Sequence, residues 1–324
     1  VRTTLALSGG RGDAPSPSRR ALDAEFDFRG IVGEHPALLQ VLATVGRVAK
    51  TRAPVLILGE SGTGKELIAD ALHRNSPRAG KAAVKVNMGA IPSTLFESEM
   101  FGHVRGAFTD ARSDRRGHIS VASGSTLFMD EIGELARPDQ VKLLRVLQDH
   151  SYRPVGASAT EQADIRVVSA TNRELAELVA AGDFREDLYY RLNLITLRLP
   201  ALRERRSDIP LIAPRLVADI ARDYGLGEVS LTPAALDWLS AQAWPGNVRQ
   251  LRQVLERTLL LAGKAQLDAA DFREDEKLRG EDVGAAFGRD FSVSPHLTLE
   301  QAERRMIEQV LAQHEGNISR VAKA

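Results

Sequence analysis

The sequence contains no cysteine among its 324 residues, which excludes disulfide bonds and thiolate metal sites. Its seven histidines show no paired ligand spacing, so a histidine metal centre is not expected either. Neither sign of charge is in excess, because 43 Lys and Arg residues balance 43 Asp and Glu residues. No segment approaches the roughly 18 apolar residues of a membrane-spanning helix. We therefore expect a cytoplasmic protein without membrane contact, in which any contact with DNA is local.

Short apolar runs with β character alternate with helical patterns over the first part of the chain. The runs occupy residues 53–58, 82–87, 125–131, 164–171 and 193–199. Such alternation predicts an α/β fold with a parallel sheet. After Pro200 the β character fades, and the helical patterns that follow predict a separate helical subdomain. These patterns occupy residues 209–225, 232–243 and 247–263.

Shifts in composition place the expected domain boundaries. The start of the chain is rich in Gly, Pro, Ser and Arg, and a later stretch is polar with scattered Gly, so both are predicted linkers. Thr298 and Gln301 form a capping box at the start of a last amphipathic pattern, which stops before it is complete. We expect a flexible linker at 1–27, an α/β subdomain at 28–200, a helical lid at 201–264, a second linker at 265–294 and the amphipathic segment at 295–324.

An eight-residue run, GESGTGKE, follows the first apolar run and precedes a helical pattern. It consists of Gly59, Glu60, Ser61, Gly62, Thr63, Gly64, Lys65 and Glu66. Glycines between a strand and a helix let backbone N–H groups surround a phosphate chain, and Lys65 adds a positive charge. The usual pattern has Ser or Thr at the last position, where this chain has Glu66. Taken alone, the run is also compatible with a structural glycine turn.

Two carboxylates strengthen the prediction of a nucleotide site. Asp130 and Glu131 end the apolar run TLFMDE, which is predicted as a buried strand. An acidic pair at the carboxyl end of such a strand suits a magnesium ligand and a group that polarises an attacking water. We therefore expect a nucleotide and Mg²⁺ as ligands, with Asp130 as the Mg²⁺ ligand and Glu131 as the catalytic carboxylate.

Several longer runs then occur in a characteristic order between about Phe28 and Gly263. They are GESGTGKE, ESEMFGHVRGAFTDA, TLFMDEIGEL, SATNREL, FREDLYYRLN, ALRERRSDIP and WPGNVRQLRQVLER. In these runs the chain resembles the bacterial enhancer-binding proteins, also called sigma-54-dependent activators, which are AAA+ ATPases. The resemblance implies a three-layer αβα P-loop sandwich with a parallel sheet and a small α-helical lid. In that family glutamate is the usual residue at the position of Glu66.

The run Gly106, Ala107, Phe108, Thr109, Asp110 and Ala111 resembles the GAFTGA loop of this family. The resemblance implies that the aromatic Phe108 is a loop tip that contacts the sigma-54 subunit of RNA polymerase. Without the resemblance, a phenylalanine packed under a loop would be the default. Asp110 replaces the family's glycine, which tolerates positive φ better than aspartate does. We expect ATP hydrolysis to survive this change, whereas coupling to sigma-54 is less certain.

Further roles follow from the resemblance, position by position. Asn87 resembles the switch asparagine that holds Glu131 away from its water, although an asparagine at a strand end can also cap the next turn. Thr171 and Asn172 resemble the sensor that reports the γ-phosphate. Arg185 and Arg191 resemble arginine fingers that reach the site of a neighbouring subunit, where a planar cation stabilises phosphoryl charge. Surface ion pairing is the alternative for both arginines.

The lid and the base pocket carry other expected roles. Asn247 is predicted to cap a helix, which places Arg249 in its first turn as the family's second sensor arginine. Trp244 is predicted to belong to the lid core. Ile31 and Val32 resemble the apolar contacts of the adenine pocket.

The C-terminal segment resembles the start of a Fis-type helix-turn-helix, and the recognition helix is missing from it. We therefore expect enhancer DNA to be a partner of a longer protein, because the element that enters the major groove is absent here. No receiver or ligand-sensing domain precedes the first linker, so we expect the sequence to be a piece of that longer protein.

Two functions are considered. The first is an ATP-driven homo-oligomeric ring, hexameric or heptameric by resemblance, that remodels promoter-bound sigma-54 RNA polymerase holoenzyme through the Phe108 loop. The second is a nucleotide- and DNA-binding regulator of the same family that does not productively engage sigma-54. A chelatase-type AAA+ motor is disfavoured by the GAFT-containing insertion.

Overall fold

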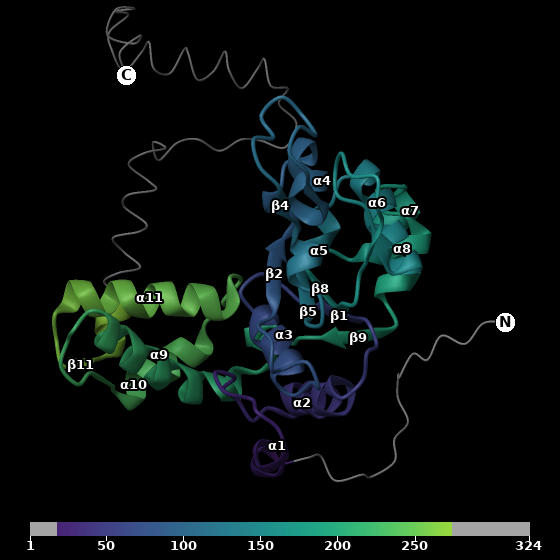
Figure 1. Cartoon of the computed structure of the whole chain (residues 1–324). Coiled ribbons are helices and arrows are strands. Elements are labelled where there is room, and N and C mark those ends of the chain that lie inside the picture. Colours follow the sequence, from purple (N-terminus) through teal and green to yellow (C-terminus); the bar gives the residue numbers. More distant parts are fainter. Residues whose placement is uncertain (1–17, 274–324) are drawn as a thin grey trace, which may run out of the picture. The chain divides into compact units, whose positions relative to one another are not determined.

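A computed structural model describes residues 18–273 and places five parallel strands in one sheet (Figure 1). The strand order is β2-β5-β8-β1-β9, and every neighbouring pair is parallel. The strands are β1 (Val55–Leu58), β2 (Val84–Asn87), β5 (Thr126–Asp130), β8 (Arg166–Thr171) and β9 (Ile195–Arg198). Each falls inside an apolar run identified from the sequence, so the prediction of a parallel α/β sheet is confirmed.

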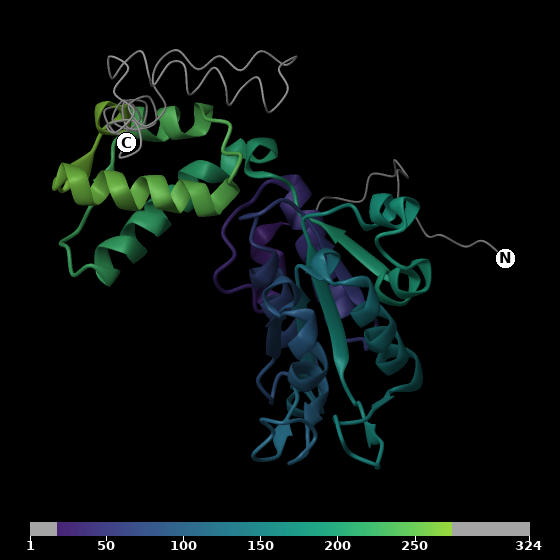
Figure 2. The same ribbon diagram turned by 90° about the horizontal axis from the view of Figure 1, so that it is seen from above.

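Alternate residues of the strands enter two separate cores. In β1, Leu56 and Leu58 belong to one core, whereas Val55 and Ile57 belong to the other. This division follows from the two-residue period of a strand, whose successive side chains point to opposite faces. Both faces are covered by helices, as the view from above shows (Figure 2). The result is the three-layer αβα sandwich that the sequence predicted.

The helices divide between the two faces. The core with Val55 and Ile57 also contains apolar residues of α2 (Pro36–Ala49) and α3 (Lys65–Arg74). The other core takes most of its helical residues from four further helices. These are α4 (Ser93–Phe101), α6 (Arg137–Asp149), α7 (Leu175–Ala181) and α8 (Glu186–Leu192).

Two short antiparallel hairpins project from the α/β part. One pairs β3 (Gly102–His103) with β4 (Arg115–Arg116), and the other pairs β6 (Ser151–Tyr152) with β7 (Glu161–Gln162). They are joined to each other, because Val104 N donates to Val155 O at 3.1 Å and Val155 N donates to Gly102 O at 2.9 Å. Short helical segments complete this part: α5 (His118–Val121), η1 (Met88–Ala90) and η2 (Ile132–Glu134).

The helical lid contains α9 (Ile209–Asp223), α10 (Pro233–Ala241) and α11 (Asn247–Ala262), as the sequence predicted. The 3₁₀ turns η3 (Leu202–Glu204) and η4 (Arg206–Asp208) lead into it. Its predicted end at residue 264 is wrong. β10 (Ser230–Leu231) pairs with β11 (Gln266–Leu267), and Lys264 forms an ion pair with Asp271 at 2.6 Å. Residues 266–271 therefore belong to the folded unit and not to a linker.

The linker predicted at residues 1–27 is also wrong over its last ten residues. They contain helix α1 (Arg19–Glu25), which begins after Ser18, whose hydroxyl accepts from Ala21 N at 3.2 Å. Leu22 is buried on this helix, so α1 packs instead of hanging free. Residues 1–17 and 274–324, which include Thr298, Gln301 and the predicted helix-turn-helix, lie outside the described residues. Between residues 18 and 273, no helix has the length and apolar character needed to cross a membrane.

Candidate functional site

The predicted phosphate loop lies between β1 and α3, at the carboxyl edge of the sheet. Gly62 and Gly64 have φ of 78° and 100°, a region that favours glycine. A Cβ at Gly62 would lie 2.3 Å from the carbonyl oxygen of Gly246, so this glycine also lets the lid approach the loop. Lys65 Nζ donates to the carbonyl oxygens of Gly59 at 2.8 Å and Glu60 at 3.1 Å. The lysine thus lies over its own loop, where phosphate oxygens would take over these contacts.

The predicted carboxylates lie on the same edge. Asp130 ends β5, and its burial raises the pKa of the carboxyl. Burial lowers the pKa of Lys65, and the negative charges of Asp130 and Glu131 counteract that effect. These mutual effects place the three groups within electrostatic range of one another. Glu131 has φ of 53°, a strained conformation for a residue with a side chain and one that recurs at functional sites.

Asn87 ends β2 beside Asp130, with which it is in register. Its Oδ1 accepts from Gly89 N at 2.9 Å and from Ala90 N at 3.2 Å, so it caps η1. Among the hydrogen bonds recorded for residues 18–273, none joins Asn87 to Glu131. Gly89 lies next to both side chains, because a Cβ at this position would lie 3.0 Å from Glu131 Oε2 and 3.4 Å from Asn87 Oδ1. The structure therefore shows the capping contact of Asn87, with the carboxylate of Glu131 close by.

The predicted sensor ends the central strand β8. Thr171 is buried, and its carbonyl oxygen accepts from Gly59 N at 3.3 Å, which ties the sensor strand to the start of the phosphate loop. Its hydroxyl accepts from Arg173 N at 3.0 Å. Asn172 is exposed beside it.

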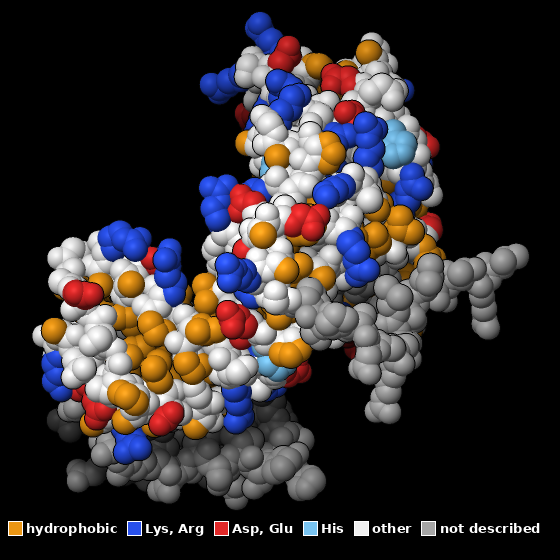
Figure 3. Space-filling model, turned by 90° about the horizontal axis from the view of Figure 1, so that it is seen from below, with side chains coloured by type: hydrophobic (Ala, Val, Ile, Leu, Met, Phe, Trp, Pro, Cys, Tyr) orange, Lys and Arg blue, Asp and Glu red, His pale blue; other side chains and the backbone are white. Residues whose placement is uncertain are grey.

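A cleft of about 910 Å³ adjoins the phosphate loop. Its lining includes Ile31 and Val32 together with Thr63 and Gly64, so the predicted base contacts and part of the phosphate loop share one cavity. Other apolar lining residues include Leu67, Leu199, Leu211 and Val248. Figure 3 shows hydrophobic side chains gathered on the lid side of one face of the molecule. The cleft is thus suited to a ligand with an apolar ring and an anionic tail.

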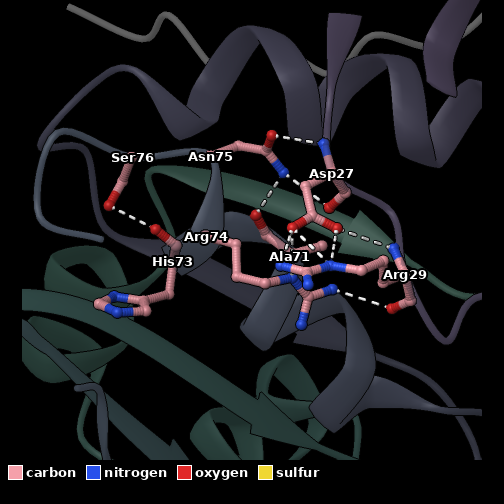
Figure 4. A network of polar contacts seen from close by, with 7 residues as sticks. All are labelled: Asp27, Arg29, Ala71, His73, Arg74, Asn75 and Ser76. Carbon is pink, nitrogen blue, oxygen red and sulfur yellow. Dashed lines mark hydrogen bonds and ion pairs between the residues drawn. The ribbon is translucent and has the colours of Figure 1, made fainter. Parts of the chain in front are cut away.

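A polar network fixes the segment that leads to Ile31 (Figure 4). Asn75, at the end of α3, accepts from Asp27 N at 2.8 Å and donates to Asp27 O at 3.0 Å. Arg74 donates to Arg29 O at 3.0 Å. The side-chain hydrogen bond from Arg29 lowers the pKa of Asp27 to about 2. Helix α3 begins at the phosphate loop, so one helix positions both the phosphate and the base ends of the cleft.

Three charged residues that sequence reasoning did not single out hold the same region. Arg19 on α1 donates to Ile31 O at 2.9 Å and to Gly33 O at 3.2 Å. Buried Arg205 donates to Thr63 O at 3.1 Å. Buried Asp208 accepts from the backbone N–H groups of Glu34 and His35 at 2.8 and 2.9 Å. Arg205 and Asp208 come from the run ALRERRSDIP, which follows β9. The many charged residues in this run were the sequence feature that could have pointed to them.

The start of α11 is joined to the phosphate loop through Asn247. The prediction that Asn247 caps this helix is wrong, because its φ is 52° and the N-cap is Gly246, without a side-chain capping bond. Its Nδ2 instead donates to Glu60 Oε2 at 3.1 Å and to Ser61 O at 3.0 Å, and its Oδ1 accepts from Leu202 N at 2.7 Å. The residue is fully buried. It therefore connects the lid with the loop instead of ending a helix.

Two arginines complete this junction. Arg203 donates to both oxygens of Glu60, at 2.8 and 2.5 Å, and this contact lowers the pKa of Glu60 to about 2. Arg249 lies in the first turn of α11, as predicted, and donates to Ser61 Oγ at 2.9 Å. Trp244 is buried in the lid, as predicted, and its indole N–H donates to Leu239 O at 2.7 Å.

Arg185 lies just before α8, and Arg191 lies on this helix. Arg185 forms an ion pair with Asp187 at 2.7 Å, and Arg191 Nε donates to Leu147 O at 2.8 Å. In the described part of the chain, no recorded hydrogen bond or ion pair joins either arginine to the phosphate loop. The structure thus does not bring them to their own chain's site.

The loop with Phe108 lies between β3 and β4. Phe108 is 43% exposed, and its ring meets the ring of His103 edge-on with centroids 4.9 Å apart. Gly106 has φ of 82°, whereas Asp110 does not adopt positive φ. Backbone bonds from Gly106 N to Ala111 O at 2.8 Å and from Ala111 N to Phe108 O at 2.9 Å close the turn. The loop therefore accommodates Asp110 without the conformational penalty that its sequence suggested.

The residues present fit a magnesium–nucleotide complex. Within residues 18–273 there is no group of three or more His, Asp or Glu side chains that could hold a metal alone. Magnesium does not need one, because it is typically held by one or two carboxylates together with phosphate oxygens and water. Asp130 is a partly buried carboxylate whose pKa is raised mainly by burial, and a bound cation would favour its charged form.

Three family models match the chain. The model described as "Sigma-54 interaction domain" matches residues 31–198. The model described as "AAA+ ATPase lid domain" matches residues 203–284, and the one described as "Bacterial regulatory protein, Fis family" matches residues 298–324.

Individual proteins are similar over the same regions. The Nif-specific regulatory protein of Azotobacter vinelandii is 46% identical over 81% of this chain and 51% of its own length. The response regulator protein PilR of Pseudomonas aeruginosa is 44% identical over 94% of this chain and 68% of its own length. The crystal structure of NtrX from Brucella abortus in complex with ATP superposes with a TM-score of 0.69 at 32% identity, covering 94% of this chain and 67% of NtrX. The chain thus spans about half the length of the first of these relatives.

Proposed function

Because the chain belongs to the sigma-54-dependent transcriptional activators of bacteria, whose core is an AAA+ domain, we propose that it hydrolyses ATP and uses the energy to remodel promoter-bound sigma-54 RNA polymerase. The observation that carries the proposal is the junction of the phosphate loop with the acidic edge of the sheet. There Lys65, Asp130 and Glu131 lie within electrostatic range beside the cleft that Ile31 and Val32 line.

Each group has a task that follows from its chemistry. The backbone of residues 59–66 and the Lys65 ammonium bind the phosphates, and Ile31 and Val32 bind the base. Asp130 holds Mg²⁺, which when bound neutralises phosphate charge. Glu131, exposed at the strand end, orients and polarises the attacking water. Asn87 accepts from the turn beside Glu131 and sets how far that carboxylate can move.

The sensors and the arginine fingers act on the phosphoryl group. Thr171 and Asn172 detect it from the end of β8, and Arg249 links it to the lid. Arg185 and Arg191 supply their charge to the neighbouring subunit, so the active form is a homo-oligomeric ring. Support for this assignment comes from their contacts within residues 18–273, which are with Asp187 and Leu147 and not with the phosphate loop of their own chain.

Replacing Glu131 with Gln tests the catalytic assignment. We expect a fluorescent ATP analogue to bind as tightly as before, whereas hydrolysis falls by about 10²-fold or more, the usual contribution of a positioned general base. Glu134→Gln is the matched control, because Glu134 lies three residues away and pairs with Arg173 at 3.3 Å. Normal turnover in Glu131→Gln would refute the assignment.

Asp110 is the one observation that favours the second function, a regulator that does not engage sigma-54. Asp110 adds a negative charge next to Thr109 and Phe108, where the family has glycine, and that charge would face the sigma-54 subunit. A regulator that binds nucleotide and DNA without engaging sigma-54 would hydrolyse ATP but fail to open promoters. We favour the activator, because Phe108 remains exposed at the loop tip despite Asp110.

A further inference from the structure

A second cavity, of about 330 Å³, lies at the edge of the sheet opposite the phosphate loop. Gly124 and Asp164 lie just before β5 and β8, and Arg166 begins β8. The remaining lining comes from residues 50–52 after α2 and 76–78 after α3. Because the strands are parallel, their starting ends lie a full strand length from Asp130 and Thr171. The cavity is therefore separate from the nucleotide cleft.

Its lining is strongly cationic. Lys50, Arg52, Arg78 and Arg166 face a single carboxylate, Asp164, which leaves three positive charges in excess. The hydrogen bond from Arg78 and then the charges of Arg78, Arg52 and Lys81 lower the pKa of Asp164, so several cations act on one anion. Such an excess in a cleft attracts a multiply charged anion.

The cations differ in how far they are already compensated. Arg78 forms an ion pair with Asp164 at 2.5 Å, whereas Lys50 pairs with Glu25 at 3.3 Å, where both side chains are well exposed. For Arg52, no ion pair is recorded within residues 18–273. Arg52 is exposed at the rim, so its guanidinium is available to a ligand.

Arg166 is the most unusual member of the group, because it is 1% exposed and has no carboxylate partner recorded in the described chain. Its terminal nitrogens donate to Ala49 O at 2.8 Å, Val48 O at 3.1 Å and Leu72 O at 3.1 Å. These carbonyl groups lie in the last turns of α2 and α3, where the helix dipole places partial negative charge. They stabilise the buried cation, but Nε of Arg166 has no hydrogen-bond partner. Burial and the nearby Arg78 charge lower the pKa of Arg166 to about 10.

We propose that this cavity is a binding site for a doubly charged phosphate group, as inorganic phosphate or a small phosphate monoester. The exposed Arg52 and Lys50 donate to the oxygens from the rim, and Arg166 supplies buried charge at the wall. Arg78 is paired with Asp164 but still adds to the positive potential in the cavity. Ser76 offers a hydroxyl that already donates to His73 O at 2.7 Å and can accept from the P–OH group of inorganic hydrogen phosphate.

The test is a calorimetric titration of the whole chain with inorganic phosphate. It is carried out in a Lys65→Ala background, which weakens anion binding at the phosphate loop. Arg52→Gln removes one rim cation without opening a buried site. Arg47→Gln is the matched control, because Arg47 is an exposed arginine on α2 whose recorded contact is with Thr44. Potassium chloride at equal ionic strength and glycerol 1-phosphate are titrated in parallel.

We expect saturable binding of phosphate to a single class of site, weakened about tenfold by Arg52→Gln and unchanged by Arg47→Gln, as the loss of one charge-assisted contact predicts. Tighter binding of glycerol 1-phosphate than of phosphate would support the site with a monoester as its ligand, and equal or weaker binding would support free phosphate. Chloride giving the same signal, no saturation with either phosphate compound, or equal weakening by both arginine variants would overturn the proposal.

Discussion

Replacing Asn247 with aspartate should weaken the junction between the lid and the phosphate loop. The change is nearly isosteric and keeps an oxygen that can accept from Leu202 N, at 2.7 Å in the native chain. It removes the Nδ2 donor that serves Ser61 O at 3.0 Å and Glu60 Oε2 at 3.1 Å. It also places a second carboxylate against Glu60 at a residue that is fully buried.

The loss of stability can be worked out from the distance between the side chains of residues 247 and 60. Two unit charges 3.1 Å apart repel by about 5 kcal/mol at an effective dielectric constant of ~20. Arg203 donates to both Glu60 oxygens and offsets part of this repulsion. The hydrogen bond to Ser61 O is lost as well, and together with the remaining repulsion this should lower the free energy of unfolding by about 3 kcal/mol. Glu60→Gln alone should cost about 1 kcal/mol or less, because Arg203 and Glu60 are each 43% exposed.

Urea unfolding of the two single variants and the double variant measures the coupling. In the double variant the glutamine amide at position 60 can donate to the new carboxylate at position 247, so a hydrogen bond replaces the repulsion. We expect the double variant to recover at least about 1 kcal/mol relative to Asn247→Asp, the range typical of contacting pairs. An unfolding midpoint of Asn247→Asp equal to that of the wild type, or strictly additive losses in the double variant, would refute the reasoning.

Three further predictions concern the cleft, the loop and pH. Arg19→Ala should weaken binding of a fluorescent ATP analogue about fivefold, because it frees the carbonyl groups of Ile31 and Gly33, whereas Arg20→Ala on the same helix should not. Equal affinities of the two variants would show that α1 does not position the base pocket. Asp110→Gly should leave the ATPase rate and the unfolding midpoint unchanged, because Asp110 does not adopt positive φ. Open-complex formation on a sigma-54 promoter should occur with both the wild type and this variant. Open-complex formation with neither would favour the regulator that does not engage sigma-54. The contact with Arg203 lowers the folded-state pKa of Glu60 from 4.5 to about 2, so its stabilising effect is present above the unfolded-state pKa and is lost as pH falls towards 2. Unfolding midpoints of the wild type and Glu60→Gln should therefore converge as pH is lowered from about 5 to 3, and a constant gap would contradict this.

The layers of the fold could be predicted because they depend on local patterns. Each of the five sheet strands is a short apolar run, and the three lid helices each follow a helical pattern. The order of the strands and the division of β1 between two cores need the whole fold. The ends of the domains were missed, because α1 is stabilised by burial of Leu22 and by Arg19 bonds to residues more than ten positions away.

The candidate site was predictable where a residue acts through its own loop or strand end. Lys65, Asp130 and Thr171 lie on one sheet edge for this reason. Asn247 was assigned a local capping role, but its bonds reach Glu60 and Ser61, nearly 190 positions earlier in the chain. Sequence spacing cannot reveal such a contact, since it depends on how the lid meets the phosphate loop.

The central claim is that one subunit's arginines complete the nucleotide site of its neighbour, and mixing two inactive variants tests it most directly. One variant is Glu131→Gln, and the other is Arg185→Ala combined with Arg191→Ala. Each should hydrolyse ATP poorly alone, and the mixture should regain activity, because the intact arginines of the first then face the intact Glu131 of the second. Full activity of the arginine variant alone, or no recovery in the mixture at protein concentrations that allow assembly, would contradict the account.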